Sequence, residues 1–166
     1  MTVREAIETR RSIRKYKDTP VEPEKLARVL EAGRLAPSAR NLQDWQFIAV
    51  TDKELIAKLQ VACMNQKQVG MAPVVLVVAA TADGALPNGR SKADVDCSIA
   101  MTQMMLAAWE EGLGTCWLAG YSDEGVKEVL GLGDGIRTVA VTPLGYPDEE
   151  PAAKPRKATE EVVVLR

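Results

Sequence analysis

The sequence of 166 residues contains no histidine. This absence excludes Ser-His and Cys-His catalytic triads, histidine-ligated haem and most catalytic zinc sites. Any chemistry must therefore come from carboxylates, Lys, Arg, Cys or Tyr, or from a cofactor that brings its own reactivity. We favour a cofactor, and we expect no metal site in the protein.

Cysteine is also scarce, and long apolar runs are missing. Cys63, Cys97 and Cys116 are odd in number, widely spaced and without a Cys-x-x-Cys pair, which argues against a disulfide framework or a structural zinc site. A reducing, cytoplasmic setting fits this pattern. No apolar run approaches the roughly 18 residues of a membrane span, and the chain starts with a polar helix, so we expect neither a span nor a signal peptide.

The net charge and the length of the chain indicate which partners and how many domains to expect. The formal net charge of -2 argues against nucleic acid as a partner, because a duplex binder needs a surplus of Lys and Arg over one face. The length suits a single domain over residues 1–166, large enough to bury a core without disulfides or metals. We find no internal repeat, low-complexity segment or interdomain linker.

Apolar periodicity predicts a mixture of helices and strands. The predicted helices cover residues 2–10, 23–36, 52–64, 91–111 and 122–130, and the predicted strands cover 45–51, 73–81, 115–119 and 137–145. The Val-rich run at 73–81 is typical of a strand covered on both faces. The helix over 91–111 is apolar over much of its circumference, so we expect it to be buried on several sides.

The segment from Arg10 to Arg14 places three guanidinium groups and the Ser12 hydroxyl within five residues, directly after a helix. Guanidinium groups bind phosphate with fixed bidentate geometry, so this cluster suits a phosphorylated ligand. The alternative is a solvated face whose cations satisfy the last carbonyls of the helix.

The C-terminal segment has two parts. Residues 148–157 are charged and rich in proline, too polar to pack, whereas residues 162–165 are four apolar residues that would be costly in water. The apolar residues either join their own sheet as an edge strand, or the polar arm of 148–166 carries them to the sheet of a second subunit. We favour the second arrangement, a homodimer, because the apolar helix over 91–111 points the same way.

Five motifs occur in order along the chain: Arg10–Arg14, Pro37–Trp45, Asn65–Gln68, Gly112–Trp117 and Lys154–Lys157. Together, over about Val3 to Val164, they resemble the nitroreductase family of FMN-dependent oxidoreductases. The resemblance implies an α+β fold with three layers, in which helices flank a central, mostly antiparallel sheet. It also implies a homodimer that exchanges its C-terminal strands and binds FMN at the subunit interface, with NADH or NADPH as the hydride donor.

The resemblance assigns a role to each end of the cofactor. Arg10 and Ser12, with Arg11 in the same cluster, would hold the FMN phosphate, and Lys154 and Arg156 would close on it from the other side. Arg14 would lie beside the flavin pyrimidine, where a cation stabilises the charge of the reduced ring and favours hydride chemistry. For Lys154–Lys157 the alternative is a solvated linker.

The remaining positions would surround the flavin ring. Asn65 matches an amide that reads the pyrimidine, with a helix cap or turn as its alternative, and Gln68 stands where relatives often carry Lys. Backbone N–H groups at Ala119 and Gly120 would approach flavin N5, because glycine permits a close approach. Four more predicted contacts, made mainly to the flavin of the other subunit, come from Pro37, Ser38, Ala39 and Asn41.

The assignment of residues 37–45 has one departure from the family pattern and one alternative. Asp44 replaces a proline common in relatives, so the local loop can differ, and an ordinary helix-to-strand connection would explain part of the 37–45 string. We interpret Cys116 as a buried small hydrophobe, because a catalytic thiolate needs a nearby base and the chain has no histidine.

The implied mechanism is ping-pong, with no catalytic side chain, because the flavin carries the chemistry. Candidate acceptors are nitroaromatics, quinones and other flavins. The connection between Pro87 and Ser91 is short, so we expect an open and unselective acceptor pocket. Three alternatives remain: a specialised flavoenzyme of the same fold, an FMN-binding carrier or redox sensor, and a dimeric scaffold that has lost flavin.

Overall fold

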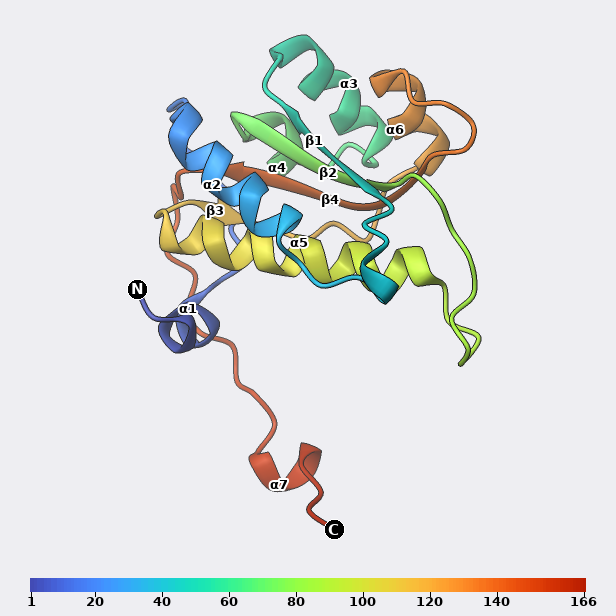
Figure 1. The fold of residues 1–166 in the computed structure, drawn as a ribbon. Coiled ribbons are helices and arrows are strands. Elements are labelled where there is room, and N and C mark those ends of the chain that lie inside the picture. Colours follow the sequence, from blue (N-terminus) through green and yellow to red (C-terminus); the bar gives the residue numbers. More distant parts are fainter.

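A computed structural model describes all residues from 1 to 166 and contains one four-stranded sheet (Figure 1). The strands are β1 (Trp45–Val50), β2 (Val74–Ala80), β3 (Gly114–Thr115) and β4 (Arg137–Gly145), and their order in the sheet is β1-β2-β4-β3. Every pairing is antiparallel. The predicted α+β class with an antiparallel sheet is confirmed.

Helices cover both faces of the sheet and make three layers (Figure 1). The helical segments are α1 (Val3–Thr9), α2 (Pro23–Arg34), the 3-10 turn η1 (Ala39–Asn41), α3 (Lys53–Ala62), α4 (Lys67–Met71), α5 (Lys92–Glu110), α6 (Asp123–Leu130) and α7 (Thr159–Val162). Side chains of β2 alternate between two cores: Leu76 and Val78 pack with α2 and α5, whereas Val75 and Val77 pack with α3, α4 and α6. The strand is therefore buried on both faces, as its Val-rich run predicts.

Three helices begin at side-chain caps on the first residues of the predicted ranges 52–64, 91–111 and 122–130. Asp52 Oδ1 accepts from the Leu55 N–H at 2.8 Å, and the hydroxyls of Ser91 and Ser122 each accept at 3.1 Å from the N–H three residues later. Such caps satisfy N–H groups that have no partner within the helix. The predicted strand over 115–119 is shorter in the structure, where β3 ends at Thr115 and only Leu118 makes a further bridge, to Val141.

Helix α5 is buried on several sides, as predicted, but part of its apolar surface is exposed. Its inner side is buried against α2 and the sheet, but Val95 and Ile99 are 38% and 36% exposed. The apolar circumference of α5 therefore exceeds what the rest of the chain covers, and a stripe formed by Val95 and Ile99 faces outward.

The C-terminal segment does not take the first of the two arrangements considered for it. It does not join its own sheet: the chain leaves the body after residue 150 and ends in the short helix α7, away from the other elements (Figure 1). Val164 and Leu165 are 75% and 92% exposed. None of the four strands pairs with this segment, so its backbone gains no hydrogen bonds from the sheet.

The α-helices range from 4 to 19 residues in length. None of them combines the length and the apolar character needed to cross a membrane.

Candidate functional site

The cationic segment after α1 is held against strand β3. Ser12 forms a parallel bridge with Thr115, and the Ile13 N–H donates to the Thr115 carbonyl at 2.9 Å. Gly114 makes this approach possible, because a Cβ on Gly114 would lie 2.5 Å from Ile13 Cγ1. The backbone position of the three arginines is thus fixed by close packing on the sheet.

The start of the C-terminal arm fixes the same segment from its other side. The Glu149 carboxylate accepts from the backbone N–H groups of Arg14 at 2.5 Å and Lys15 at 3.2 Å. The Asp148 N–H donates to the Lys15 carbonyl at 3.0 Å. The expectation that residues 148–157 are too polar to pack is therefore wrong for Asp148 and Glu149, because backbone groups of Arg14 and Lys15 bind the Glu149 carboxylate and the Asp148 N–H.

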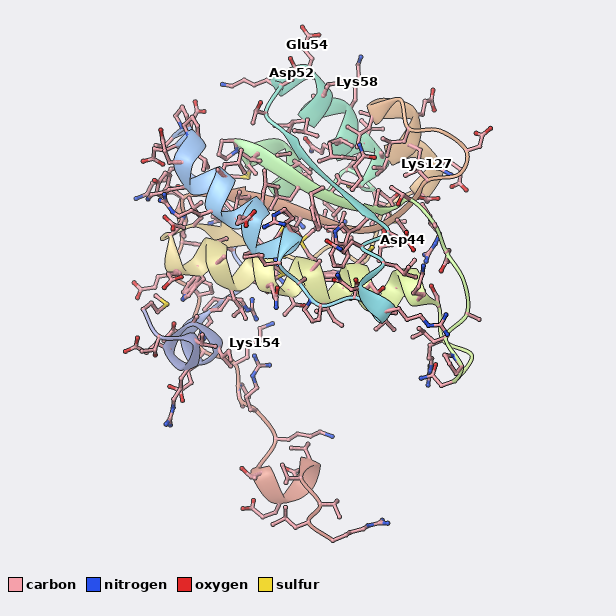
Figure 2. All side chains as sticks on the ribbon, viewed as in Figure 1. Asp44, Asp52, Glu54, Lys58, Lys127 and Lys154 are labelled. Atoms are coloured by element: carbon pink, nitrogen blue, oxygen red, sulfur yellow. The ribbon has the colours of Figure 1, made fainter.

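Between the segment and the arm lies a cavity of ≈ 560 Å³. Figure 2 shows Lys154 on the arm beside α1. Six of the fourteen predicted cofactor contacts line this one cavity: Arg10, Arg11, Ser12, Arg14, Lys154 and Arg156. Residues that are 140 positions or more apart along the chain thus converge on one cationic space.

Arg10 and Arg11 have different surroundings in this cavity. One guanidinium nitrogen of Arg11 donates to the carbonyls of Glu8 at 2.9 Å and Arg10 at 3.0 Å, which is the helix-end role weighed for this cluster. The buried Nη1 of Arg10 has no hydrogen-bond partner. Burial, and then the nearby charges of Arg156 and Arg11, lower the pKa of Arg10. A buried cation repelled by its neighbours fits an anionic group such as a phosphate.

A second cluster of predicted residues forms around Gly120. Gln66 Nε2 donates to the Gly120 carbonyl at 2.6 Å, and Gln68 Nε2 donates to Gln66 Oε1 at 2.8 Å. A Cβ on Gly120 would lie 3.2 Å from Met64 Sδ, so this glycine is closely packed. Gln68, the residue that departs from the family pattern, therefore orients Gln66. Sequence reasoning missed Gln66, although it lies within the Asn65–Gln68 motif.

Asn65 lies at the exit of α3 in a left-handed backbone conformation, with φ of 55°, and Met64 before it has φ of 56°. Asparagine tolerates this region better than most residues, so the turn interpretation accounts for the backbone of Asn65. The residue is exposed beside Gln66, which leaves its amide accessible at the second cluster.

The two clusters lie at opposite ends of one stretch of chain. Thr115 bridges to Ser12, and Leu118 donates from its N–H to the Val141 carbonyl at 3.0 Å, so the stretch from Thr115 to Gly120 runs along the sheet. Ala119 is exposed and Gly120 is half-buried at its end. An elongated ligand along this stretch can contact the cationic cavity at one end and backbone amides at the other.

The family model described as "Nitroreductase family" matches residues 7–71 and 61–146. The chain belongs to the nitroreductase family. An NADH dehydrogenase of Thermus thermophilus is 33% identical over 95% of this chain and 92% of that protein. An FMN-dependent nitroreductase of Clostridium difficile has a TM-score of 0.82 at 32% identity, covering 97% and 98% of the two chains. An NADPH:FMN oxidoreductase of Vibrio harveyi, solved with NAD+, has a TM-score of 0.88 at 30% identity, covering 98% and 76%.

The third group of predicted residues in this nitroreductase chain, Pro37, Ser38, Ala39 and Asn41, lies away from the cationic cavity. The Ala39 N–H donates to Asp96 near the start of α5, whereas α1 contacts the other end, where Trp109 Nε1 donates to Thr9 Oγ1 at 2.9 Å. Figure 2 shows Asp44 on the body and Lys154 apart from it, beside α1. The two contacts, at Asp96 and Trp109, are 13 residues apart on α5, which is about 20 Å at about 1.5 Å per residue, so the loop and the cationic cavity are separate within one chain.

The cysteines of this nitroreductase are packing residues. All three are free and buried. Burial raises the pKa of the Cys63 thiol to about 11 and that of Cys97 to about 12. Burial also raises the pKa of Cys116, although Arg14 and Arg10 oppose the shift. None is a thiolate near neutral pH, in agreement with the interpretation of Cys116.

Proposed function

We propose that this chain is an FMN-dependent NAD(P)H oxidoreductase that reduces electron-poor acceptors such as nitroaromatics, quinones or flavins. The observation that carries the proposal is the cationic cavity in which the buried Nη1 of Arg10 has no partner. The names of the Clostridium difficile and Vibrio harveyi proteins, which specify FMN, support the choice of cofactor.

Four side chains are assigned to the FMN phosphate: Arg10, Ser12, Lys154 and Arg156. The guanidinium groups supply bidentate donors, the ammonium supplies charge, and the hydroxyl supplies a further hydrogen bond. Arg14, on the rim of the same cavity, is assigned to the pyrimidine end, where its charge stabilises negative charge on the reduced ring. Arg11 contributes charge to the cavity, while its Nη1 donates to the carbonyls of Glu8 and Arg10.

The cluster around Gly120 is assigned to the reactive part of the cofactor. Asn65 offers both a donor and an acceptor to an imide edge, and the Ala119–Gly120 backbone offers N–H groups at close range. When bound, FMN supplies the redox chemistry by taking a hydride from NAD(P)H and later giving two electrons to an acceptor, which makes the kinetics ping-pong. The protein side chains orient and bind, and solvent supplies protons, because the chain has no histidine and its thiols are protonated.

We assign the loop containing Pro37, Ser38, Ala39 and Asn41 to the FMN of a second subunit. If two α5 helices pack antiparallel about a two-fold axis, the start of one lies beside the end of the other, and the loop reaches the partner's cationic cavity. The outward stripe of Val95 and Ile99 supports α5 as the contact surface. The arm over 148–166 then carries its exposed apolar end to the partner, in the reducing cytoplasm that the free thiols favour.

The proposal is tested by titrating FMN into the purified protein and then adding NADH or NADPH without oxygen. We expect stoichiometric FMN binding and rapid bleaching of the flavin absorbance, followed by recovery when a quinone is added. Binding without bleaching would identify a carrier or sensor instead of an oxidoreductase. A protein that does not bind FMN would contradict the assignment of the cationic cavity.

A further inference from the structure

Asp96 is a buried carboxylate that the proposed function leaves without a role. It lies on the second turn of α5 and is 6% exposed. Both of its oxygens accept from one backbone group, the Ala39 N–H, at 3.2 and 3.1 Å. A buried carboxylate is costly, so it is retained where the group that it binds must be held in place.

Lys92 forms a second contact between α5 and the same loop. Its ammonium pairs with the Asp44 carboxylate, and both side chains are mostly buried. Lys92 is the first residue of α5, where the positive end of the helix dipole disfavours a cation, so helix stability does not account for it. Lys92 and Asp96 are four residues apart and thus lie on one face of the helix.

The loop between these contacts has a conformation that side chains rarely adopt. Arg40, Asn41 and Gln43 have φ of 54°, 55° and 56°. Within the loop, Gln43 N–H donates to Ser38 Oγ at 3.1 Å and Trp45 N–H donates to the Gln43 carbonyl at 2.8 Å. Left-handed residues other than glycine are strained, and they persist only when surrounding contacts hold them.

We propose that Asp96 and Lys92 are positioning residues that hold the loop over residues 38–44 in its left-handed shape for contact with the cofactor of the partner subunit. This inference rests on the proposed function, because the loop has no site of its own within one chain. Asp96 fixes the start of the loop and Lys92 fixes its end. Asp44, the residue that departs from the family pattern, is thereby the anchor for Lys92.

The inference is tested with Asp96→Ala and its conservative counterpart Asp96→Asn, which retains one carbonyl acceptor for Ala39. We expect Asp96→Ala to weaken FMN binding roughly tenfold and Asp96→Asn to restore most of the affinity. We also expect faster amide hydrogen exchange in residues 38–44 of Asp96→Ala, without FMN, and unchanged exchange in β2 and β4. Glu110→Ala is the matched control, because Glu110 is exposed at the far end of the same helix.

The outcomes separate this inference from the proposed function. Faster loop exchange with unchanged FMN affinity would overturn it, because the contact would then be structural only. Unchanged loop exchange would overturn it as well. If Asp96→Ala does not fold, Lys92→Met applies the same two measurements at the other anchor. Failure of the wild-type protein to bind FMN would instead overturn the proposed function.

Discussion

At the scale of single residues, Arg10 is the side chain with the clearest conflict between stability and binding. Its buried Nη1 has no partner, and Arg156 and Arg11 lie close enough to lower its pKa. Without an anion, the unpaired charge of Arg10 destabilises the folded chain. A bound phosphate would accept charge-assisted hydrogen bonds from the guanidinium and remove this destabilisation. Removing the charge of Arg10 should therefore lower the affinity for FMN and raise the stability of the protein without FMN.

The substitution Arg10→Met keeps the apolar stem and removes the charge. We expect the apo protein to unfold at an equal or higher temperature, and FMN affinity to fall roughly 10- to 100-fold, as for the loss of about 1.5–3 kcal/mol of charged hydrogen bonding. Thermal denaturation with and without FMN, together with an FMN titration, measures both quantities.

Arg4→Met is the control for Arg10→Met, because Arg4 is exposed on α1 and pairs only with Glu8 at 2.8 Å. It should change neither quantity by much, since exposed pairs contribute little. A strongly destabilised Arg10→Met apo protein with normal FMN affinity would contradict the assignment of Arg10 to the phosphate.

The sequence predicts a site residue when neighbouring residues in the chain already indicate its chemistry. Arg10 and Ser12 are recognisable, because several guanidinium groups beside a hydroxyl suggest an anion. Gln66 and Glu149 are not, since each acts by bonding a backbone group that is distant in sequence. Asp96 is hidden in the same way within an apolar helix.

At the scale of elements, the close approach of the cationic segment to β3 depends on Gly114. A Cβ there would meet Ile13 Cγ1 at 2.5 Å and Ile13 Cβ at 2.7 Å, and Ile13 is fully buried. The side chain cannot move aside easily, so the segment carrying Ser12 would have to shift. The proposed site therefore depends on the backbone position of the cationic segment as well as on its charged side chains.

We therefore expect Gly114→Ala to destabilise the protein by about 1–3 kcal/mol through overpacking and to weaken FMN binding as well. Chemical denaturation measures the first effect and an FMN titration the second. Gly133→Ala is the control, because nothing lies within 4 Å of its added Cβ and its backbone conformation is ordinary. Equal behaviour of the two variants would show that the packing of Ile13 on Gly114 does not position the segment.

The elements themselves show which patterns a sequence reveals. Long elements with a clear period were predictable: the strand over 137–145 and the capped helices begin where expected. The five-residue α4 and the turn η1 were missed, because they are too short for a period and depend on left-handed residues at 64–65 and 40–41. The residues at 162–165 have the composition of a strand, but none of the four strands of the sheet pairs with them.

At the scale of the whole molecule, the exposed apolar side chains support the proposed dimer. Besides Val95 and Ile99 on α5, the exposed large apolar residues include Leu35, Leu42, Val162, Val163, Val164 and Leu165. Scattered apolar residues such as Val3, Ile7 and Val61 are normal on a surface. Several of the others lie together on α5, on the loop that α5 holds and on the detached arm. Packing of two α5 helices would cover them and complete the proposed cofactor site.

Ile99→Glu places a charge in the middle of the α5 stripe. We expect it to turn a dimer into a monomer and to weaken FMN binding, because each cationic cavity would lose the partner's loop over residues 38–44. Sedimentation velocity measures the oligomeric state, and an FMN titration on the same sample measures the affinity. Val61→Glu is the control: Val61 is 66% exposed, but it lies on α3 on the opposite side of the sheet. A wild-type protein that sediments as a monomer and still binds FMN tightly would contradict the shared site, since the loop held by Asp96 lies at the far end of α5 from Arg10.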